Sequence, residues 1–191
     1  MDNFDFKRQY DERFGDVTRG AWYCDYVECA YELKLLDGMS DSIFAPQGNL
    51  TVAECVKLAS CLHQIYNEGD VTLQNAQNNW FSNYVNYALQ NGVLPYAFMN
   101  YNRPATRCEV AVIFANALPE EALTAINAER VVPDVASDAW YADEVQELFC
   151  AGVLTGYEDG CFRPDSQISR AEISAMVARM AQCDLRVTDN R

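Results

Sequence analysis

Histidine and basic residues are scarce in this sequence, and their scarcity excludes several functions. One histidine, His63, occurs in 191 residues, which leaves little room for a catalytic triad or for a zinc site with ordinary ligand spacing. Fourteen basic residues stand against 28 acidic ones, for a formal net charge of -14. Such an acidic surface disfavours nucleic acid and anionic membranes as partners. We therefore expect no nucleic-acid partner, no metal and no cofactor.

Long apolar runs are also missing. No stretch approaches the roughly 18 uninterrupted apolar residues of a transmembrane helix, so we expect no membrane insertion. The start at Met1 has no basic patch followed by an apolar run, which predicts that no signal peptide is present. If the protein acts outside the cell, we expect this chain to be a segment of a longer parent protein with further domains.

Cysteine is abundant by contrast, yet its spacing forms no known pattern. None of the eight cysteines belongs to a C-x-x-C pair. Several fall on the apolar stripes of predicted helices, where cysteine behaves as a small hydrophobic residue. The sequence favours mostly free, buried thiols and leaves at least one disulfide open. The cysteines are Cys24, Cys29, Cys55, Cys61, Cys108, Cys150, Cys161 and Cys183.

Half of the chain is hydrophobic, and three tryptophans reveal a repeat in its pattern. Trp22, Trp80 and Trp140 are each followed by an aromatic residue. At offsets four, five, eight and nine from each tryptophan, all positions except Glu144 are apolar or aromatic. This spacing predicts one amphipathic helix after each tryptophan.

A second helix follows in each repeat, and each begins with a capping box. In this motif a hydroxyl caps the backbone N–H three residues on, while a glutamate side chain reaches back to the cap. From each glutamate, offsets one, four, five and eight are again apolar, which predicts three further amphipathic helices. The capping pairs are Thr51 with Glu54, Thr106 with Glu109, and Ser169 with Glu172.

The loops between paired helices agree in the first and third repeats. Gly38, Phe44 and Pro46 have the spacing of Gly156, Phe162 and Pro164, whereas the second repeat is three residues shorter. Together these patterns predict an all-α fold of three helix–loop–helix repeats. The expected boundaries are an N-terminal extension at 1–13, repeats at 14–68, 69–127 and 128–185, and a C-terminal tail at 186–191.

These motifs resemble the S-layer homology repeat, over about residues 14 to 183. The third repeat carries nearly the whole pattern: Pro133-Asp134-Val135, Trp140-Tyr141, Gly152-Val153-Leu154, Gly156 to Gly160, Phe162-Arg163-Pro164 and Ile168 to Glu172. The first repeat departs from it at Val52, where the family places arginine, and at Lys34, where the family places glycine. The second lacks the Asp-Val motif and most of the inter-helix loop.

The resemblance implies a pseudo-threefold unit with grooves between adjacent repeats. In the family such grooves bind a secondary cell-wall polysaccharide, often one bearing ketal-linked pyruvate. This binding would hold a larger surface or S-layer protein non-covalently to the wall of a Gram-positive-type bacterium. The expected partner is therefore a cell-wall glycan.

The candidate glycan-binding residues combine cations, aromatic rings and turn residues. Arg107 and Arg170 lie in the first turn of capped helices, where the helix dipole favours anions, and Arg103 and Arg163 lie in the preceding loops. Each arginine can also be a surface ion pair. The remaining candidates, each with a structural alternative as a core, turn or packing residue, are Trp22, Trp80, Trp140, Asp16, Asp134, Gly38 and Gly156.

Two other functions compete with glycan binding. An enzyme is disfavoured because no motif pairs a nucleophile with a base, although paired acids for glycoside hydrolysis stay possible. A protein–protein module of the cell envelope, assisted by calcium, is the second alternative. Tyr157-Glu158-Asp159-Gly160 is similar to half a calcium loop, but the spaced acids of an EF-hand are missing.

Overall fold

The fold is entirely helical. A computed structural model describes residues 3–189, so residues 1–2 of the expected N-terminal extension and 190–191 of the expected tail lie outside the described range. Within residues 3–189, two short 3-10 helices, η1 (Glu120–Leu123) and η2 (Cys183–Leu185), accompany six α-helices. The prediction of an all-α fold is confirmed. The α-helices are α1 (Cys24–Glu32), α2 (Val52–Glu68), α3 (Ser82–Gln90), α4 (Arg107–Ala115), α5 (Ala142–Cys150) and α6 (Arg170–Ala181).

A complete capping box starts each of α2, α4 and α6. At α6, for example, the Ser169 hydroxyl accepts from the Glu172 N–H at 3.2 Å, and the Glu172 carboxylate accepts from the Ser169 N–H at 2.8 Å. Thr51 with Glu54 and Thr106 with Glu109 form the other two boxes. These boxes satisfy N–H groups that a helix start leaves without partners.

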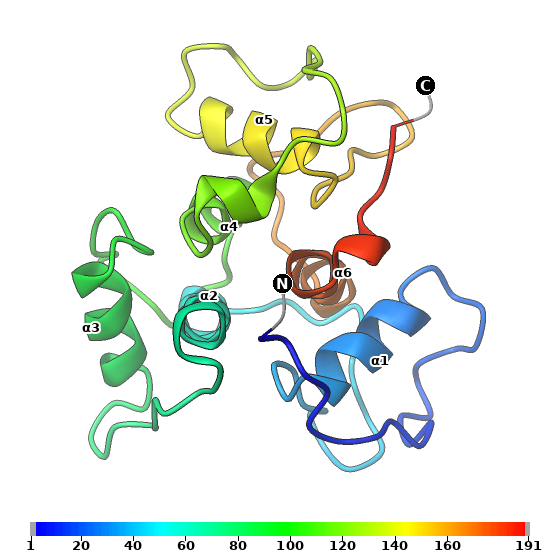
Figure 1. The fold of residues 1–191 in the computed structure, drawn as a ribbon, viewed down its shortest axis with the longest axis vertical. Coiled ribbons are helices and arrows are strands. Elements are labelled where there is room, and N and C mark those ends of the chain that lie inside the picture. Colours follow the sequence, from blue (N-terminus) through cyan, green and yellow to red (C-terminus); the bar gives the residue numbers. More distant parts are fainter. Residues whose placement is uncertain (1–2, 190–191) are drawn as a thin grey trace.

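The three capped helices lie at the centre of the molecule, and α1, α3 and α5 surround them (Figure 1). Each outer helix packs on the central helix that precedes it around the ring, not on the one that follows it in the chain. Thus α3 packs on α2, α5 packs on α4, and α1 packs on α6. Because α1 and α6 come from opposite ends of the chain, their contact closes the ring. This is the predicted pseudo-threefold arrangement of three helix–loop–helix units.

A ring of backbone hydrogen bonds joins the segments that precede the central helices. Ala105 N–H donates to Leu50 O at 2.9 Å, Leu50 N–H to Ile168 O at 3.3 Å, and Ile168 N–H to Ala105 O at 3.2 Å. All three side chains are buried. Isolated β-bridges flank this ring at Asn49–Ser169, Thr51–Pro104 and Thr106–Gln167. The ring therefore fixes the three helix starts relative to one another.

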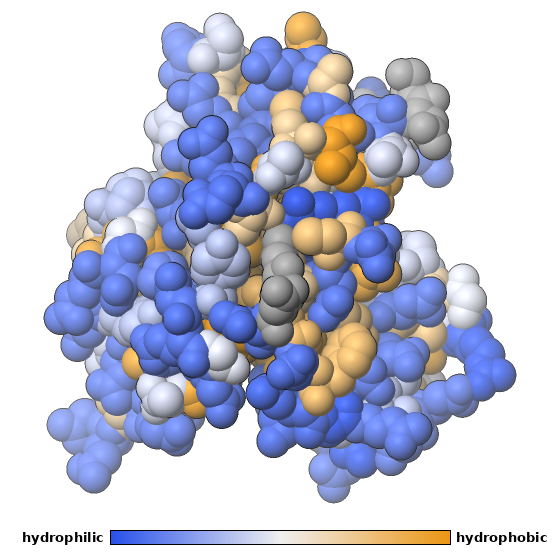
Figure 2. All heavy atoms as spheres, viewed as in Figure 1, coloured by the Kyte–Doolittle hydropathy of each residue, from blue (hydrophilic) through white to orange (hydrophobic). Residues whose placement is uncertain are grey.

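The first residues that the structure describes belong to the same core. Phe4 and Tyr10 are buried, and Phe4 O accepts a hydrogen bond from the Gln182 side chain at 3.1 Å, just after α6. The view along the central helices shows a mostly hydrophilic surface with scattered apolar side chains (Figure 2). None of the helices within residues 3–189 is long and apolar enough to cross a membrane.

All eight cysteines lie within residues 3–189, and none forms a disulfide there. Cys29, Cys55, Cys61 and Cys108 are buried. Burial raises the pKa of the Cys29 and Cys61 thiols, each to about 11, which keeps both protonated and unreactive at neutral pH.

Candidate functional site

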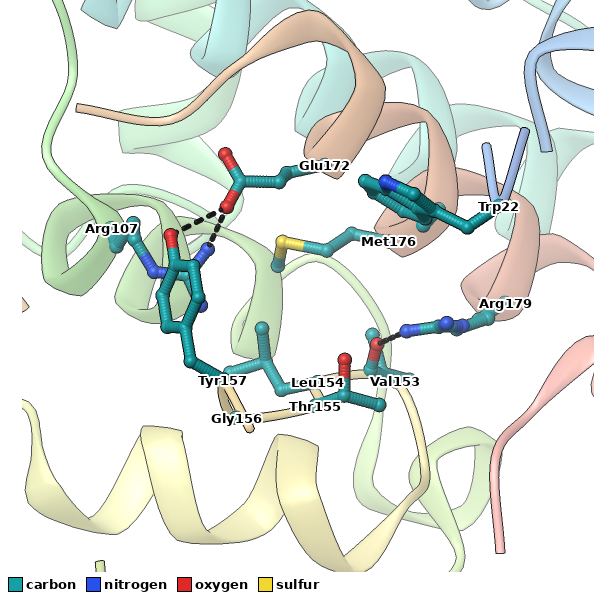
Figure 3. A pocket seen from close by; sticks show the side chains of 11 residues that line it. Trp22, Arg107, Val153, Leu154, Thr155, Gly156, Tyr157, Glu172, Met176 and Arg179 are labelled. Carbon is teal, nitrogen blue, oxygen red and sulfur yellow. Dashed lines mark hydrogen bonds and ion pairs between the residues drawn. The ribbon is translucent and has the colours of Figure 1, made fainter. Parts of the chain in front are cut away.

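We call the two helices of each repeat a helix pair: α1–α2, α3–α4 and α5–α6. A groove lies where the three helix pairs meet, and each pair contributes side chains to it. It has a volume of about 260 Å³, and we call it the Trp22 groove. Trp22 comes from the turn before α1, Arg107 from the start of α4, and the rest from α6 and the loop before it (Figure 3). Its lining residues are Trp22, Arg107, Val153, Leu154, Thr155, Gly156, Tyr157, Glu172, Ala175, Met176 and Arg179.

The middle of the Trp22 groove is apolar, and its ends are charged. Trp22 lies beside Met176 on one side, and Leu154 lies on the opposite side (Figure 3). The Trp22 side chain is unusually open, since 59% of the residue's surface is exposed. Arg107 and Arg179 lie at opposite ends (Figure 3). An exposed indole beside an apolar floor, with guanidinium groups nearby, suits a ligand that has a flat apolar face and anionic substituents.

Arg107 is buried and bridges two neighbouring helix pairs. Its Nε donates to Phe162 O at 2.8 Å, and its Nη1 forms an ion pair with Glu172 Oε1 at 2.7 Å. The Tyr157 hydroxyl donates to the same Glu172 oxygen at 2.9 Å. Burial pushes the pKa of Glu172 up, but the Ser169 N–H and the Arg107 charge more than offset this, so the pKa lies below its ordinary value of 4.5. Glu172 is thus a carboxylate at neutral pH and orients both Arg107 and Tyr157.

Backbone N–H groups at the starts of the central helices are engaged within the protein, although the helix dipole favours an anion there. Loop carbonyl groups of a neighbouring helix pair accept from the first two N–H groups of each central helix. In α4, Arg107 N–H donates to Ser166 O at 2.9 Å and Cys108 N–H to Pro164 O at 3.0 Å. The same pattern joins α2 to Arg103 O and Tyr101 O, and α6 to Gly48 O and Pro46 O. Anion binding here depends on side chains.

Arg170 repeats the loop-bridging role of Arg107 on another side of the ring. Its Nε donates to Phe44 O at 2.7 Å, its Nη2 donates to Asp37 O, and its guanidinium lies 4.4 Å from the centre of the Phe44 ring. Burial lowers the pKa of Arg170 below its ordinary value. Val52 occupies the corresponding position in the first helix pair, so the third side of the ring has no such arginine.

Arg163 and Arg103 are engaged by acidic residues. Arg163 forms an ion pair with Asp159 at 3.0 Å and stacks over the Tyr157 ring at 3.9 Å, so it borders the Trp22 groove. Arg103 binds both carboxylate oxygens of Glu109, one of them at 2.9 Å, within the capping box of α4. The structure therefore places Arg103 away from the Trp22 groove.

Asp16 and Asp134 hold the turns that precede the prolines of the F-x-P loops. Asp134 accepts from the N–H groups of Phe162 and Arg163, both at 2.7 Å, and Asp16 binds Phe44 and Ala45 in the same way at 2.8 and 2.7 Å. Arg163 and Ala45 both have φ of 58°, a left-handed conformation that costs energy in residues other than glycine. Each carboxylate thus stabilises a strained turn and has no contact with the Trp22 groove.

Gly38 and Gly156 do not have positive φ, so a left-handed turn does not explain them. Close packing explains them instead. A Cβ on Gly38 would lie 2.4 Å from Phe14 Cε1, and one on Gly156 would lie 2.9 Å from Arg130 Nη2. Of the two, Gly156 lines the Trp22 groove.

Trp140, the counterpart of Trp22 in the third helix pair, lies in a different setting. Tyr96 stacks edge-on against it at 6.1 Å, and Phe98 lies 5.4 Å from Tyr96. Arg103 lies 5.6 Å from the Phe98 ring centre. Tyr96 occupies the position that Gly156 holds in the third helix pair, counting from the Val-Leu that follows the outer helix in each. We call Trp140, Tyr96, Phe98 and Arg103 the Trp140 cluster, in which the edge of Trp140 contacts Tyr96 while 53% of the tryptophan stays exposed.

Trp80 is half-buried and packs edge-on against Phe81 and Tyr84 of its own helix, with ring centres 5.6 and 6.4 Å apart. The sequence candidates thus divide among separate places. Trp22, Arg107 and Gly156 meet in the Trp22 groove with Arg163 at its border, whereas Trp140 and Arg103 meet in the Trp140 cluster.

Sequence reasoning missed Tyr157 and Arg179, which both line the Trp22 groove. Tyr157 was considered only as part of a calcium loop. That loop binds protein groups instead, because Asp159 accepts from Cys161 N–H at 3.0 Å and from Arg163. Arg179 lies seven residues after Glu172, where the other two repeats have Cys61 and Asn116. Comparing these three positions would have revealed a charge peculiar to the third repeat.

Comparison with known proteins identifies the class of domain. The family model for the S-layer homology domain matches residues 13–54 and 133–173. These segments run from the Asp-bound turns through the F-x-P loops into the starts of α2 and α6. In these two segments, which together make up less than half of the chain, the sequence is similar to the S-layer homology domain. Domains of this family anchor S-layer and other cell-surface proteins to the bacterial cell wall.

Three relatives illustrate the range of proteins that carry similar segments. The surface-layer 125 kDa protein of Lysinibacillus sphaericus is 30% identical over 56% of this chain and 10% of its own length. The amylopullulanase of Thermoanaerobacterium thermosulfurigenes is 25% identical over 88% of this chain and 9% of its own length. Cell surface glycoprotein 1 of Acetivibrio thermocellus is 36% identical over 39% of this chain and 3% of its own length. The chain thus spans a tenth or less of these relatives.

Proposed function

We propose that this chain is a non-catalytic module that anchors a larger surface protein to the cell wall by binding a wall glycan in the Trp22 groove. The glycan is a secondary cell-wall polysaccharide with anionic substituents, and ketal-linked pyruvate is the substituent that the family resemblance favours. The helix pair α3–α4 acts as a third repeat of the same kind, because it has the same capping box and the same packing.

One observation carries this proposal: the Trp22 groove contains side chains from all three helix pairs. A sugar ring stacked on Trp22 would contact Met176 and Leu154 with its apolar face. A carboxylate at its edge would lie near Arg107, whose second Nη group has no protein partner within residues 3–189. The groove is assembled only when the ring of helices is closed, which couples binding to the complete fold.

The three sides of the ring differ in ways that favour the Trp22 groove. Val52 removes the arginine from one side, and on the side of Trp140 the bulky Tyr96 stands where Gly156 lines the Trp22 groove. In the Trp22 groove, the tryptophan comes from the first helix pair, the arginine from the second and the loop from the third. On the side of Trp140, which belongs to the third pair, the arginine position is therefore Val52 of the first pair, and the loop is that of Tyr96 in the second. Both departures thus affect the same side of the ring. We propose that the Trp140 side does not bind glycan.

Co-sedimentation with purified sacculi of a Gram-positive bacterium that bears an S-layer tests the function. We expect the chain to bind intact sacculi, and to bind much less after hydrofluoric acid has removed the secondary polysaccharide. Trp22→Ala should weaken binding by about tenfold or more, because it removes the exposed aromatic platform. The matched control is Trp140→Ala, which removes a tryptophan of similar exposure, 53%, from the side that has Val52 in place of the arginine and Tyr96 in place of the glycine. This variant should bind as the parent chain does.

Each other outcome has a defined meaning. Equal binding to stripped sacculi would replace the secondary polysaccharide by peptidoglycan as the ligand. No binding to either would contradict the proposal and favour a protein partner. Equal losses in Trp22→Ala and Trp140→Ala would contradict the choice of groove.

A further inference from the structure

Arg179 is one of three buried arginines within residues 3–189, and it is the one that no acidic residue or loop motif of the repeat explains. It lies in α6, only 6% of its surface is exposed, and its guanidinium lies at the wall of the Trp22 groove, opposite Arg107 (Figure 3). Its Nη1 donates to Val153 O at 3.0 Å and its Nη2 to the Tyr26 hydroxyl at 2.9 Å. A guanidinium has five N–H donors, so three of these have no partner among residues 3–189, and the buried Nε is one of them.

Within residues 3–189 no carboxylate balances the charge of Arg179, whose guanidinium lies 4.6 Å from the centre of the Tyr26 ring. Arg107 has Glu172 at 2.7 Å, whereas no carboxylate in the described part of the chain lies within ion-pair distance of Arg179. Both of its hydrogen-bond acceptors are neutral. A buried charge without a counter-charge is costly, and buried N–H groups without acceptors add to that cost. The free protein therefore holds a cation with unused donors next to its groove.

The fold itself does not require this cation. The corresponding positions, seven residues after each capping-box glutamate, are Cys61 in α2 and Asn116 directly after α4. Those helices pack on α3 and α5 as α6 packs on α1, without a charge at this position. Only the helix that borders the Trp22 groove carries the arginine, which points to a role in ligand binding.

We propose that Arg179 forms a second anion-binding subsite, which takes a carboxylate or phosphate group of the glycan at the opposite end of the groove from Arg107. This inference rests on the proposed function and adds to it that the ligand carries two anionic groups. The apolar stretch formed by Trp22, Leu154 and Met176 separates the two cations, so these groups flank the apolar face of one sugar or belong to successive sugars. The guanidinium fork matches the geometry of either anion.

Binding of the full chain to purified polysaccharide, released from sacculi by muramidase digestion so that its phosphate esters stay intact, tests this subsite. Arg179→Met removes the charge and keeps the length of the side chain, and we expect it to lower affinity by roughly tenfold, the usual effect of losing one charge-assisted hydrogen bond. Arg179→Lys keeps the charge without the fork and should bind with intermediate affinity. Arg13→Gln, which removes a surface arginine paired with Asp11, is the matched control and should bind as the parent chain does.

A second polysaccharide sample identifies the anion. Carbodiimide activation followed by borohydride converts carboxylates to alcohols and leaves phosphates intact. If the subsite takes a carboxylate, parent chain and Arg179→Met should bind the reduced polysaccharide equally. If the tenfold difference persists, the subsite takes a phosphate. Thermal melting of each variant without polysaccharide shows whether its fold is intact. If Arg179→Met melts at a lower temperature than the parent chain, Arg179→Lys takes its place in the comparison with the parent chain.

Unchanged affinity of Arg179→Met for the intact polysaccharide would overturn the subsite. Loss of binding in Trp22→Ala in the same assay would then still support the proposed function. If the parent chain itself fails to bind, the proposed function fails and the subsite fails with it.

Discussion

At the scale of single residues, the arginines show how one side-chain type serves different tasks. Arg107 and Arg170 are buried and connect a helix start to the loop of a neighbouring helix pair. Arg163 and Arg103 are bound by nearby carboxylates. Their positions beside helix starts are visible in the sequence, but their partners are not. Those partners lie more than fifty residues away for Arg107 and more than a hundred for Arg170, so only the closed fold brings them together.

Lys34 provides a test of local backbone strain. It has φ of 57° after α1, where Gly92 and Gly152 follow α3 and α5 with φ of 75° and 70°. Lys34→Gly should raise the free energy of unfolding by about 1 kcal/mol, because a left-handed conformation costs other residues about that much. Urea denaturation measures the change. Lys57→Gly, inside α2, is the control and should lower stability by about 1 kcal/mol; a lower urea midpoint for Lys34→Gly would contradict the strain.

At the scale of helices, the sequence predicts the elements well and their partners poorly. The capping motifs at Thr51, Thr106 and Ser169 coincide with the starts of α2, α4 and α6, because capping depends on residues three apart. The apolar stripes indicate which face of each helix is buried. They do not say which helix covers that face, so the packing of each outer helix on the preceding central helix was not predictable from periodicity.

The capping box of α6 predicts a pH dependence of stability. The folded-state pKa of Glu172 lies below its ordinary value of 4.5, so its carboxylate stabilises the fold above that pH, and this contribution is lost as the pH falls through the folded-state pKa. At pH 7, Glu172→Gln should cost about 1–3 kcal/mol of unfolding free energy. At pH 3 the difference between parent and variant should be clearly smaller. Urea titrations at both pH values measure it, and an equal difference at the two would refute the assignment.

At the scale of the whole molecule, the contact between α1 and α6 makes the fold cooperative. Removing any helix pair deprives two helices of their partners. The central helix of each pair packs on the outer helix of the next pair, and its outer helix packs on the central helix of the previous pair. The hydrogen-bond ring of Leu50, Ala105 and Ile168 also needs all three pairs. We expect no stable intermediate with two pairs.

A chain cut between the first and second helix pairs tests this cooperativity. The fragment 69–191 should have little helix in circular dichroism, because α3 lacks α2 and α6 lacks α1. Adding the fragment 1–68 should restore the helical signal. A fragment 69–191 that is helical and melts cooperatively by itself would contradict this account.

The same contact sets the number of units. In an open solenoid each repeat presents a face for another, so arrays of any length are stable. Here α1 already occupies the face of α6 on which the outer helix of a fourth pair would pack. A fourth copy of the motif in the same chain would have to begin a separate ring. The architecture is therefore self-terminating, and a parent protein that needs more anchors must gain them in whole sets of three.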